Sequence, residues 1–167
     1  MKENNKRYAL ILAGGKGSRL WPISTTNKPK QYLNLYSNNI MINETIKRIE
    51  SIFEYDNIFV ITNIDQKELA ERYIDNRIPR ENIIFEPMSK NTAMCIFYAS
   101  IKILEQRGNG TITILSSYHY IDETEKLLNN DKKLERFIKL TSKTNFISLY
   151  FNFLSIKNRY KLKNPLD

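Results

Sequence analysis

The sequence predicts an α/β fold in which a mainly parallel sheet is covered by helices on both faces. Two observations lead to this prediction. Four short apolar runs, rich in β-branched residues and bounded by polar residues, are typical of buried strands. Between them lie longer segments whose apolar residues recur at helical spacing. Strands that alternate with helices form parallel sheets, and ligands bind beyond the carboxyl ends of such strands.

The expected strands are short, and each is followed by residues that suit a loop. Glycines follow the first run, a Glu-Pro pair follows the third, and two serines follow the fourth. In a parallel sheet these three segments would meet at one edge. The four expected strands are Tyr8–Leu12, Ile58–Thr62, Ile83–Phe85 and Thr111–Leu115.

Polar residues and helix breakers mark the ends of the expected helices. Asn43 is a candidate N-cap, because its side chain can accept a backbone N–H. Pro79 stops the second helix, and a glycine turn beginning at Gly108 ends the third. A further helical pattern follows the fourth strand. The four expected helices are Asn43–Phe53, Asp65–Asn76, Asn91 or Thr92 to about Gln106, and Glu123–Lys143.

Length and composition indicate one globular domain. The chain has 167 residues, of which 41% are hydrophobic, so it can bury a core. Its single cysteine, Cys95, is expected to be a buried apolar residue, which suits a reduced, cytoplasmic setting. No apolar stretch reaches membrane length, so no membrane partner is expected. The net charge is +8, but basic residues are scattered, which favours anionic substrates over nucleic acid.

The stretch after the first strand has the composition of a phosphate-binding turn. Gly14, Gly15 and Gly17 fall within four residues, and glycine lets the backbone approach a ligand closely. Successive N–H groups in such a turn can form an anion-binding nest. Arg19 adds a planar donor fork, and Lys30 lies on a segment stiffened by a proline. Together these residues predict a cradle for a polyphosphate.

Two other glycine motifs do not match this stretch. The P-loop requires Gly-Lys-Ser, but residues 16–18 read Lys-Gly-Ser. The dinucleotide fingerprint requires a third glycine where Leu20 stands. The glycines alone would suit an ordinary turn. Arg19, the Trp-Pro pair at 21–22 and the Pro-Lys-Gln triplet at 29–31 favour the phosphate interpretation.

Residues 13–20 (AGGKGSRL), followed by Pro-Lys at 29–30, resemble the signature of the sugar-1-phosphate nucleotidyltransferases. Trp-Pro-x-Ser at 21–24 and Pro-Lys-Gln at 29–31 narrow the resemblance to the mannose-1-phosphate guanylyltransferases. The resemblance implies a Rossmann-like three-layer nucleotidyltransferase fold, incomplete at its C-terminal side. It implies a cytoplasmic transferase of GDP-mannose and polysaccharide biosynthesis, which converts GTP and mannose-1-phosphate into GDP-mannose and pyrophosphate.

The resemblance also implies roles for individual residues. Arg19 would hold the triphosphate, and Lys30 would reach the reacting phosphates, so both are expected to be catalytic. A second signature, Glu-Pro at 86–87 followed by Asn-Thr-Ala at 91–93, would shape the nucleoside pocket, although Asn91 and Thr92 alone would suit a helix cap. The expected nucleotide-binding residues are Leu12, Ala13, Gly14, Gly15, Gly17, Ser18, Glu86, Asn91 and Thr92.

The chain departs from the family at its expected metal site. The family uses Mg²⁺ and has an aspartate ligand where this chain has Tyr118. A neutral phenol is a poor magnesium ligand, so the site is expected to be incomplete and no metal ligand is predicted. His119 matches the family, but a lone histidine makes no metal site. Asp122 and Glu123 have the wrong spacing to replace the missing carboxylate.

The second departure is the end of the chain. Residues 1–145 are expected to form the N-terminal part of the nucleotidyltransferase domain, and 146–167 a divergent tail outside the family fold. The apolar Phe146–Ile156 suits a membrane-surface segment, an added edge strand or, as we prefer, unselected sequence in a truncated chain.

These departures leave alternatives to the transferase. One is a non-catalytic nucleotide-binding fragment or pseudogene product, and another is an enzyme for a different sugar-1-phosphate and nucleotide. A third is a chain completed by a separate C-terminal half or a homo-oligomer, and a much weaker one is a nucleic-acid binder.

Overall fold

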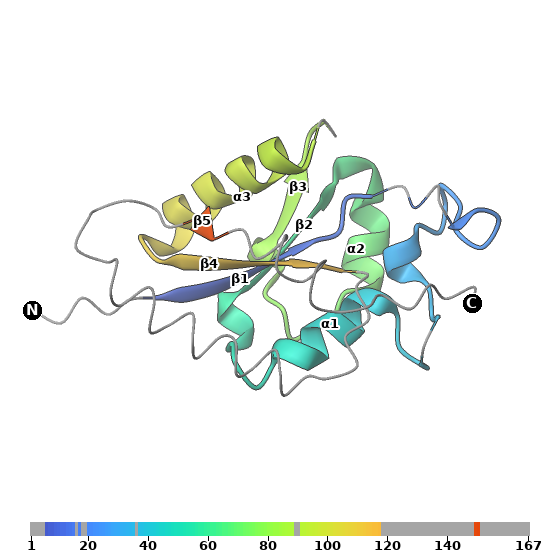
Figure 1. Cartoon of the computed structure of the whole chain (residues 1–167), viewed down its shortest axis with the longest axis horizontal. Helices are drawn as coiled ribbons and strands as arrows, with labels where there is room; N and C mark the ends of the chain where they lie inside the picture. The colour runs from blue at the N-terminus through green and yellow to red at the C-terminus, as the bar shows by residue number, and fades with distance from the viewer. Residues whose placement is uncertain are drawn as a thin grey trace, which may run out of the picture.

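The strands form a single parallel sheet (Figure 1). The computed structural model describes residues 6–15, 17, 20–35, 37–88, 91–117 and 149–150. The sheet has the order β3-β2-β1-β4-β5, and all neighbouring strands run parallel. The four expected strands are all present within one residue of their predicted bounds. The strands are β1 (Arg7–Leu12), β2 (Ile58–Asn63), β3 (Ile83–Glu86), β4 (Thr111–Ser116) and β5 (Leu149–Tyr150).

β1 lies at the centre of the sheet. Its last residue, Leu12, pairs with Ile61 of β2 on one side and with Ser116 of β4 on the other. The chain passes outward from β1 through β2 to β3 and then returns to place β4 on the opposite side of β1. The direction of winding therefore reverses between β1 and β4. Open α/β sheets bind ligands beyond the strand ends at such a point.

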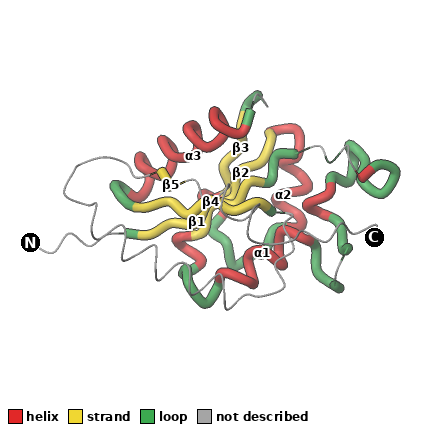
Figure 2. The backbone as a smooth tube through the Cα atoms, in the orientation of Figure 1, coloured by secondary structure: helices red, strands yellow, loops and turns green. Residues whose placement is uncertain are grey.

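Helices cover both faces of the sheet, as predicted (Figure 2). The helices are α1 (Met41–Ile49), α2 (Lys67–Tyr73) and α3 (Thr92–Arg107), with short 3-10 turns at Lys30–Tyr32, Tyr55–Asn57, Ile64–Gln66 and Arg80–Asn82. Alternate residues of β1 face opposite layers: Ala9 and Ile11 join the core under α1 and α2, and Tyr8 and Leu10 join the core under α3. No helix in the described part of the chain is long and apolar enough to cross a membrane.

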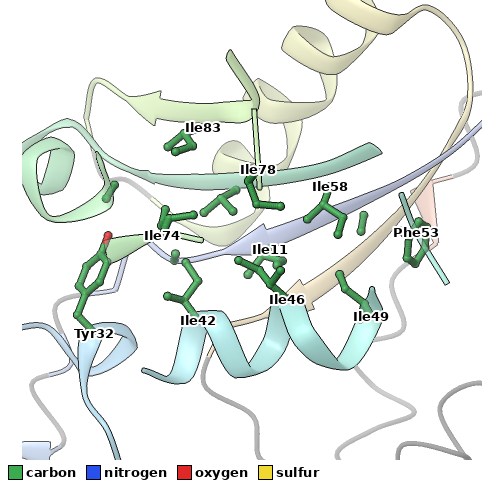
Figure 3. Packing of buried hydrophobic residues seen from close by; sticks show 14 residues of the cluster. Ile11, Tyr32, Ile42, Ile46, Ile49, Phe53, Ile58, Ile74, Ile78 and Ile83 are labelled. Carbon is green, nitrogen blue, oxygen red and sulfur yellow. The ribbon is translucent and has the colours of Figure 1, made fainter. Parts of the chain in front are cut away.

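The core beneath α1 is built from isoleucines at helical spacing (Figure 3). Ile42, Ile46 and Ile49 point from the helix toward the sheet, where they meet Ile11 and Ile58. All five side chains are at most 1% exposed. Because a buried isoleucine stabilises a fold by about 1.5–3 kcal/mol, this stripe anchors α1 to the sheet.

The prediction that Asn43 caps the first helix is wrong. α1 begins earlier, at Met41, after an Ile40 N-cap, and this start carries the buried Met41 into the core. The Asn43 side chain instead joins α1 to the segment at the end of α2. Its Oδ1 accepts the N–H of Asp75 at 3.0 Å, and its Nδ2 donates to the Tyr73 carbonyl at 2.9 Å. Two tertiary hydrogen bonds therefore replace the expected local cap.

The second helix is shorter than predicted, whereas the third agrees with its prediction. A 3-10 turn precedes α2, and the chain becomes extended at Ile74 (ψ 138°), well before Pro79. This extension places Ile74 in the core, where it is 3% exposed. Asn91 caps α3, and Gly108 ends it with a φ of +83°.

The tail contributes a short strand to the sheet edge. Leu149 of β5 lies opposite Ile112 of β4. This pairing corresponds to the edge-strand interpretation of the apolar segment, rather than to the interpretation that we preferred from the sequence. The expected helix Glu123–Lys143 lies outside the described residues, and the domain boundary at residues 145 and 146 stays a prediction.

Candidate functional site

The glycine loop begins where β1 ends, at the point where the winding of the sheet reverses. The Ala13 N–H donates to the Ile61 carbonyl at 2.8 Å and so extends the ladder with β2. The Leu12 carbonyl accepts the N–H of Ser117, beyond β4, at 3.2 Å. The predicted binding residues Leu12 and Ala13 are therefore held between the carboxyl ends of two neighbouring strands.

Gly17 packs against the backbone of Lys30. Its φ of +72° lies in the left-handed region, which favours glycine. A Cβ at Gly17 would lie 3.0 Å from the Lys30 nitrogen and 3.1 Å from Ser24 Oγ. The Ser24 hydroxyl also donates to the Gly17 carbonyl. The fold therefore brings the third glycine of the loop beside the predicted catalytic lysine.

The side chain of Lys30 extends along the loop. Its Cε lies 3.9 Å from the position that a Cβ would take on Gly15. Gly15 is exposed, whereas Lys30 is half-buried. An anion on this side of Gly15 would lie near an ammonium group as well as glycine N–H groups, and charge-assisted hydrogen bonds are the stronger kind.

A buried carboxylate lies beside Gly14, the first glycine of the loop. Glu86 ends β3 and pairs in register with Asn63 at the end of β2, and both residues are buried. A Cβ on Gly14 would lie 4.0 Å from Glu86 Oε2 and 3.7 Å from the Asn63 nitrogen. A carboxylate repels phosphate but accepts hydrogen bonds from hydroxyl and amino groups. Glu86 therefore suits the nucleoside part of a nucleotide.

Cys95 lies near Glu86, in the first turns of α3. Burial raises the pKa of the Cys95 thiol to about 12, and the negative charge of Glu86 contributes to the rise. The side chain is buried in the core under α3. A buried thiol that stays protonated is not a nucleophile, and the prediction of a buried apolar cysteine is confirmed.

The structure places Asn91 and Thr92 at the N-terminus of α3, where both are exposed. Asn91 Oδ1 accepts the Met94 N–H at 2.9 Å, so the helix-cap interpretation of Asn91 is confirmed. Helix N-termini favour anions through their free N–H groups. Nucleotide contacts by these two residues stay a prediction.

Six residues named from the sequence around the expected site lie outside the described residues: Ser18, Arg19, Tyr118, His119, Asp122 and Glu123. Their expected roles stay predictions. Within the described ranges, no three His, Cys, Asp or Glu side chains lie close enough to hold a metal ion. That part of the chain does not provide the carboxylate cluster that Mg²⁺ prefers.

Gln31 is a part of the site whose role was not predicted. It is 1% exposed and lies beneath the glycine loop. Its Nε2 lies 2.6 Å from the Ala13 carbonyl oxygen, 3.1 Å from that of Gly15 and 2.6 Å from Gln66 Oε1. The only signal in the sequence was its place in the Pro-Lys-Gln triplet. The triplet does not indicate which groups the Gln31 side chain would hydrogen-bond.

Comparisons with known proteins agree with the fold. The Nucleotidyl transferase family matches residues 8–147. The chain is 32% identical over 120 residues to the alginate biosynthesis protein AlgA of Pseudomonas putida, an alignment that covers 71% of this chain. It is 37% identical over 114 residues, or 68% of its length, to a mannose-1-phosphate guanylyltransferase of Escherichia coli. Each alignment covers 24% of the relative, so the chain spans about a quarter of their length.

A solved structure has a similar fold. It is the structure named as a mannose-1-phosphate geranyltransferase from Thermus thermophilus. The two superpose with a TM-score of 0.68 at 25% sequence identity, over 83% of this chain and 39% of the other. The parallel sheet with helices on both faces is therefore the fold of this group of proteins.

Proposed function

This chain belongs to the nucleotidyl transferase family, and from that membership we propose that the carboxyl edge of its sheet binds a nucleoside triphosphate and a sugar 1-phosphate. More narrowly, we propose GTP and mannose-1-phosphate as substrates, with GDP-mannose and pyrophosphate as products. The relative of that name, which is 37% identical, supports this choice, as does the signature over residues 13–31. GDP-mannose would then supply polysaccharide biosynthesis.

In the proposed reaction, an oxygen of the sugar phosphate attacks the α-phosphorus of GTP. A new P–O bond forms to that oxygen, and the bond to the departing pyrophosphate breaks. The protein contributes mainly position and charge. Arg19 would hold the triphosphate and the leaving pyrophosphate, and Lys30 would approach the reacting phosphates. Mg²⁺ is proposed to enter as a counter-ion of the triphosphate.

The contact between Gly17 and Lys30 is the observation that carries this proposal. It joins two segments of the signature into one surface at the strand ends. Gly15 is exposed there, and the Lys30 side chain passes close to it, with its Cε 3.9 Å from the position of a Cβ on Gly15. A polyphosphate needs several donors around one anionic group, and this surface offers backbone and ammonium donors together.

The residues around Gly14 suit a nucleoside. Glu86 ends its strand beside Gly14, near the start of α3, and its carboxylate can accept hydrogen bonds from a ribose or base. Phosphates near Gly15 and Lys30, with a nucleoside near Gly14 and Glu86, would place a nucleotide along the loop. The reduced, buried Cys95 is compatible with the cytoplasmic setting that we propose.

A second function is favoured by a specific residue. Tyr118 stands where the family has a metal-binding aspartate, which favours a chain that binds nucleotide without turning it over. The chain spans about a quarter of the length of these curated relatives. A chain that works with a separate C-terminal half or with a second copy is another alternative. A different sugar-1-phosphate or nucleotide is a further alternative.

The test is a phosphorus NMR time course on purified protein with GTP, mannose-1-phosphate and Mg²⁺. The same measurement is made on Lys30→Met and on a control, Lys28→Met, which removes an exposed lysine two residues away. Growth of GDP-mannose and pyrophosphate signals, lost in Lys30→Met and kept in Lys28→Met, would support the transferase.

Other outcomes separate the alternatives. Broadened GTP signals without product would indicate nucleotide binding alone. Activity that appears only after addition of a separately expressed C-terminal half of a relative would indicate a chain that needs a partner. Sharp, unchanged GTP signals would overturn the proposed function altogether.

A further inference from the structure

We propose that Gln31 is a positioning residue that sets the orientation of the peptide groups in the glycine loop. Its buried carboxamide turns the carbonyl oxygens of Ala13 and Gly15 inward, which leaves the opposite side of the loop to a nucleotide. This inference rests on the proposed function, because it takes that side to be the one that binds phosphate.

The carboxamide nitrogen of Gln31 is surrounded by acceptors. The carbonyl oxygens of Ala13 and Gly15 lie 2.6 and 3.1 Å from Nε2, and Gln66 Oε1 lies at 2.6 Å. The Thr62 hydroxyl also lies within reach of the Ala13 carbonyl, at 3.2 Å. The first half of the loop is thus fixed from beneath by side chains from two other segments.

These acceptors determine which way the carboxamide faces. An amide group has two N–H donors at its nitrogen and only acceptors at its oxygen. If the group were turned over, Gln31 Oε1 would face the oxygens of Ala13 and Gly15 at hydrogen-bond distance without a proton between them. That arrangement is repulsive, so the donor side must face the loop.

The opposite end of the same carboxamide supports this role. Gln31 Oε1 is buried and has no hydrogen-bond partner among the described residues. A buried acceptor without a hydrogen bond destabilises the folded state. A methionine of similar length would bury no unsatisfied acceptor. The advantage of a glutamine at this position therefore comes from the two N–H donors of its amide group.

A clamp of this kind matters because glycine peptides reorient easily. In a trans peptide the N–H points opposite to the C=O. With the Ala13 carbonyl held toward Gln31, the Gly14 N–H of the same peptide group points away from Gln31. The Gly15 carbonyl, held in the same way, cannot turn its negative oxygen toward a bound phosphate. The loop is therefore arranged for an anion before the anion binds.

The test compares Gln31→Met with a matched control, Asn82→Leu. Asn82 is also fully buried, and its Nδ2 donates to the carbonyls of Asp56 and Ile58 at 2.9 and 3.1 Å. It performs the same kind of clamping at the amino end of β2, away from the glycine loop. Three quantities are measured on the full chain: the GTP dissociation constant, the free energy of unfolding, and the NMR shift and hydrogen exchange of the Gly14 amide.

Both variants are expected to be less stable, but only Gln31→Met is expected to weaken GTP binding, by about tenfold or more. Gln31→Met should also shift the Gly14 amide resonance and accelerate its exchange in the free protein. Asn82→Leu should leave both unchanged. Equal losses of affinity in the two variants, or a wild-type Gly14 resonance in Gln31→Met, would overturn the inference.

Two further outcomes are informative. If the wild-type protein does not bind GTP, the proposed function fails, while the Gly14 resonance of the free protein still tests the clamp. If Gln31→Met does not fold, the carboxamide protons of Gln31 are followed in the wild type. They should exchange far more slowly than those of the exposed Gln106. Equal exchange would overturn the clamp.

Discussion

The backbone of Gly17 lies so close to Lys30 that a Cβ on the glycine would be 3.0 Å from the backbone nitrogen of Lys30. The contact joins the end of the glycine loop to the segment that carries the cation. Glycine is needed there for two reasons, the left-handed backbone and the close approach. Packing therefore constrains this position even before a ligand is considered.

Gly17→Ala is expected to destabilise the protein more than Gly108→Ala. Both glycines have positive φ, +72° and +83°, so an alanine is strained at either position. Only Gly17 also has neighbours in the way, since nothing lies within 4 Å of a Cβ on Gly108. Urea unfolding of the two variants measures the difference, and GTP titration should show weaker binding for Gly17→Ala alone. Equal unfolding free energies would contradict the crowding seen at Gly17.

Ile46→Ala is expected to lower the free energy of unfolding by about 2–5 kcal/mol, because it leaves a cavity between α1 and the sheet. Ile46 is fully buried beside Ile11 and Ile58 (Figure 3). Ile23→Ala is the control, since Ile23 is 56% exposed and its truncation should change stability by less than about 0.5 kcal/mol. Urea unfolding measures both. Similar values for the two variants would show that α1 does not pack as described.

Stability is expected to fall in alkali partly because of Cys95. Its pKa is raised from 9.0 to about 12 by burial, so as the pH rises through this window the unfolded chain releases the thiol proton first. The contribution of this group is complete below pH 9.0 and is lost as the pH approaches about 12. Unfolding of the wild type and of Cys95→Ala is compared across that range, and the wild type should lose more stability. If the unfolding free energies of the two proteins fell in parallel with pH, the folded state would not keep the Cys95 thiol protonated.

The buried thiol should also react slowly. Cys95 is the only cysteine in the chain, so alkylation reports on it alone. Iodoacetamide at about pH 9, near the ordinary pKa of a thiol, is expected to label the urea-unfolded protein much faster than the folded protein. Equal rates would indicate that the core under α3 opens readily.

Tyr118→Asp is expected to make GTP binding more dependent on Mg²⁺. The substitution supplies a carboxylate at the position where the family has one, and Mg²⁺ prefers carboxylate ligands to a neutral phenol. GTP dissociation constants are measured with and without Mg²⁺ for the wild type and the variant, with Tyr118→Asn as an uncharged control. If the aspartate variant behaves like the asparagine variant, the correspondence of residue 118 to the family ligand is wrong.

Much of the fold was predictable because its signals are local. Apolar runs bounded by polar residues predicted four strands to within a residue, and apolar residues at helical spacing predicted that helices lie between them. The end of α3 at Gly108 was predictable for the same reason, since a residue with positive φ at a helix end is usually glycine. The glycine loop and Lys30 were recognised from a short ordered signature, which also indicated the family.

Other features depend on which distant segments meet. Asn43 is a residue type that often caps helices, yet its side chain forms tertiary hydrogen bonds with Tyr73 and Asp75. The helix starts two residues earlier, at the buried Met41. The partners of Gln31 lie in the glycine loop and beyond β2, and no local pattern identifies them. A residue's own chemistry and spacing thus predicted the elements and the candidate phosphate loop. The orientation of that loop follows from packing, because a buried donor takes whichever acceptors the folded chain brings within reach.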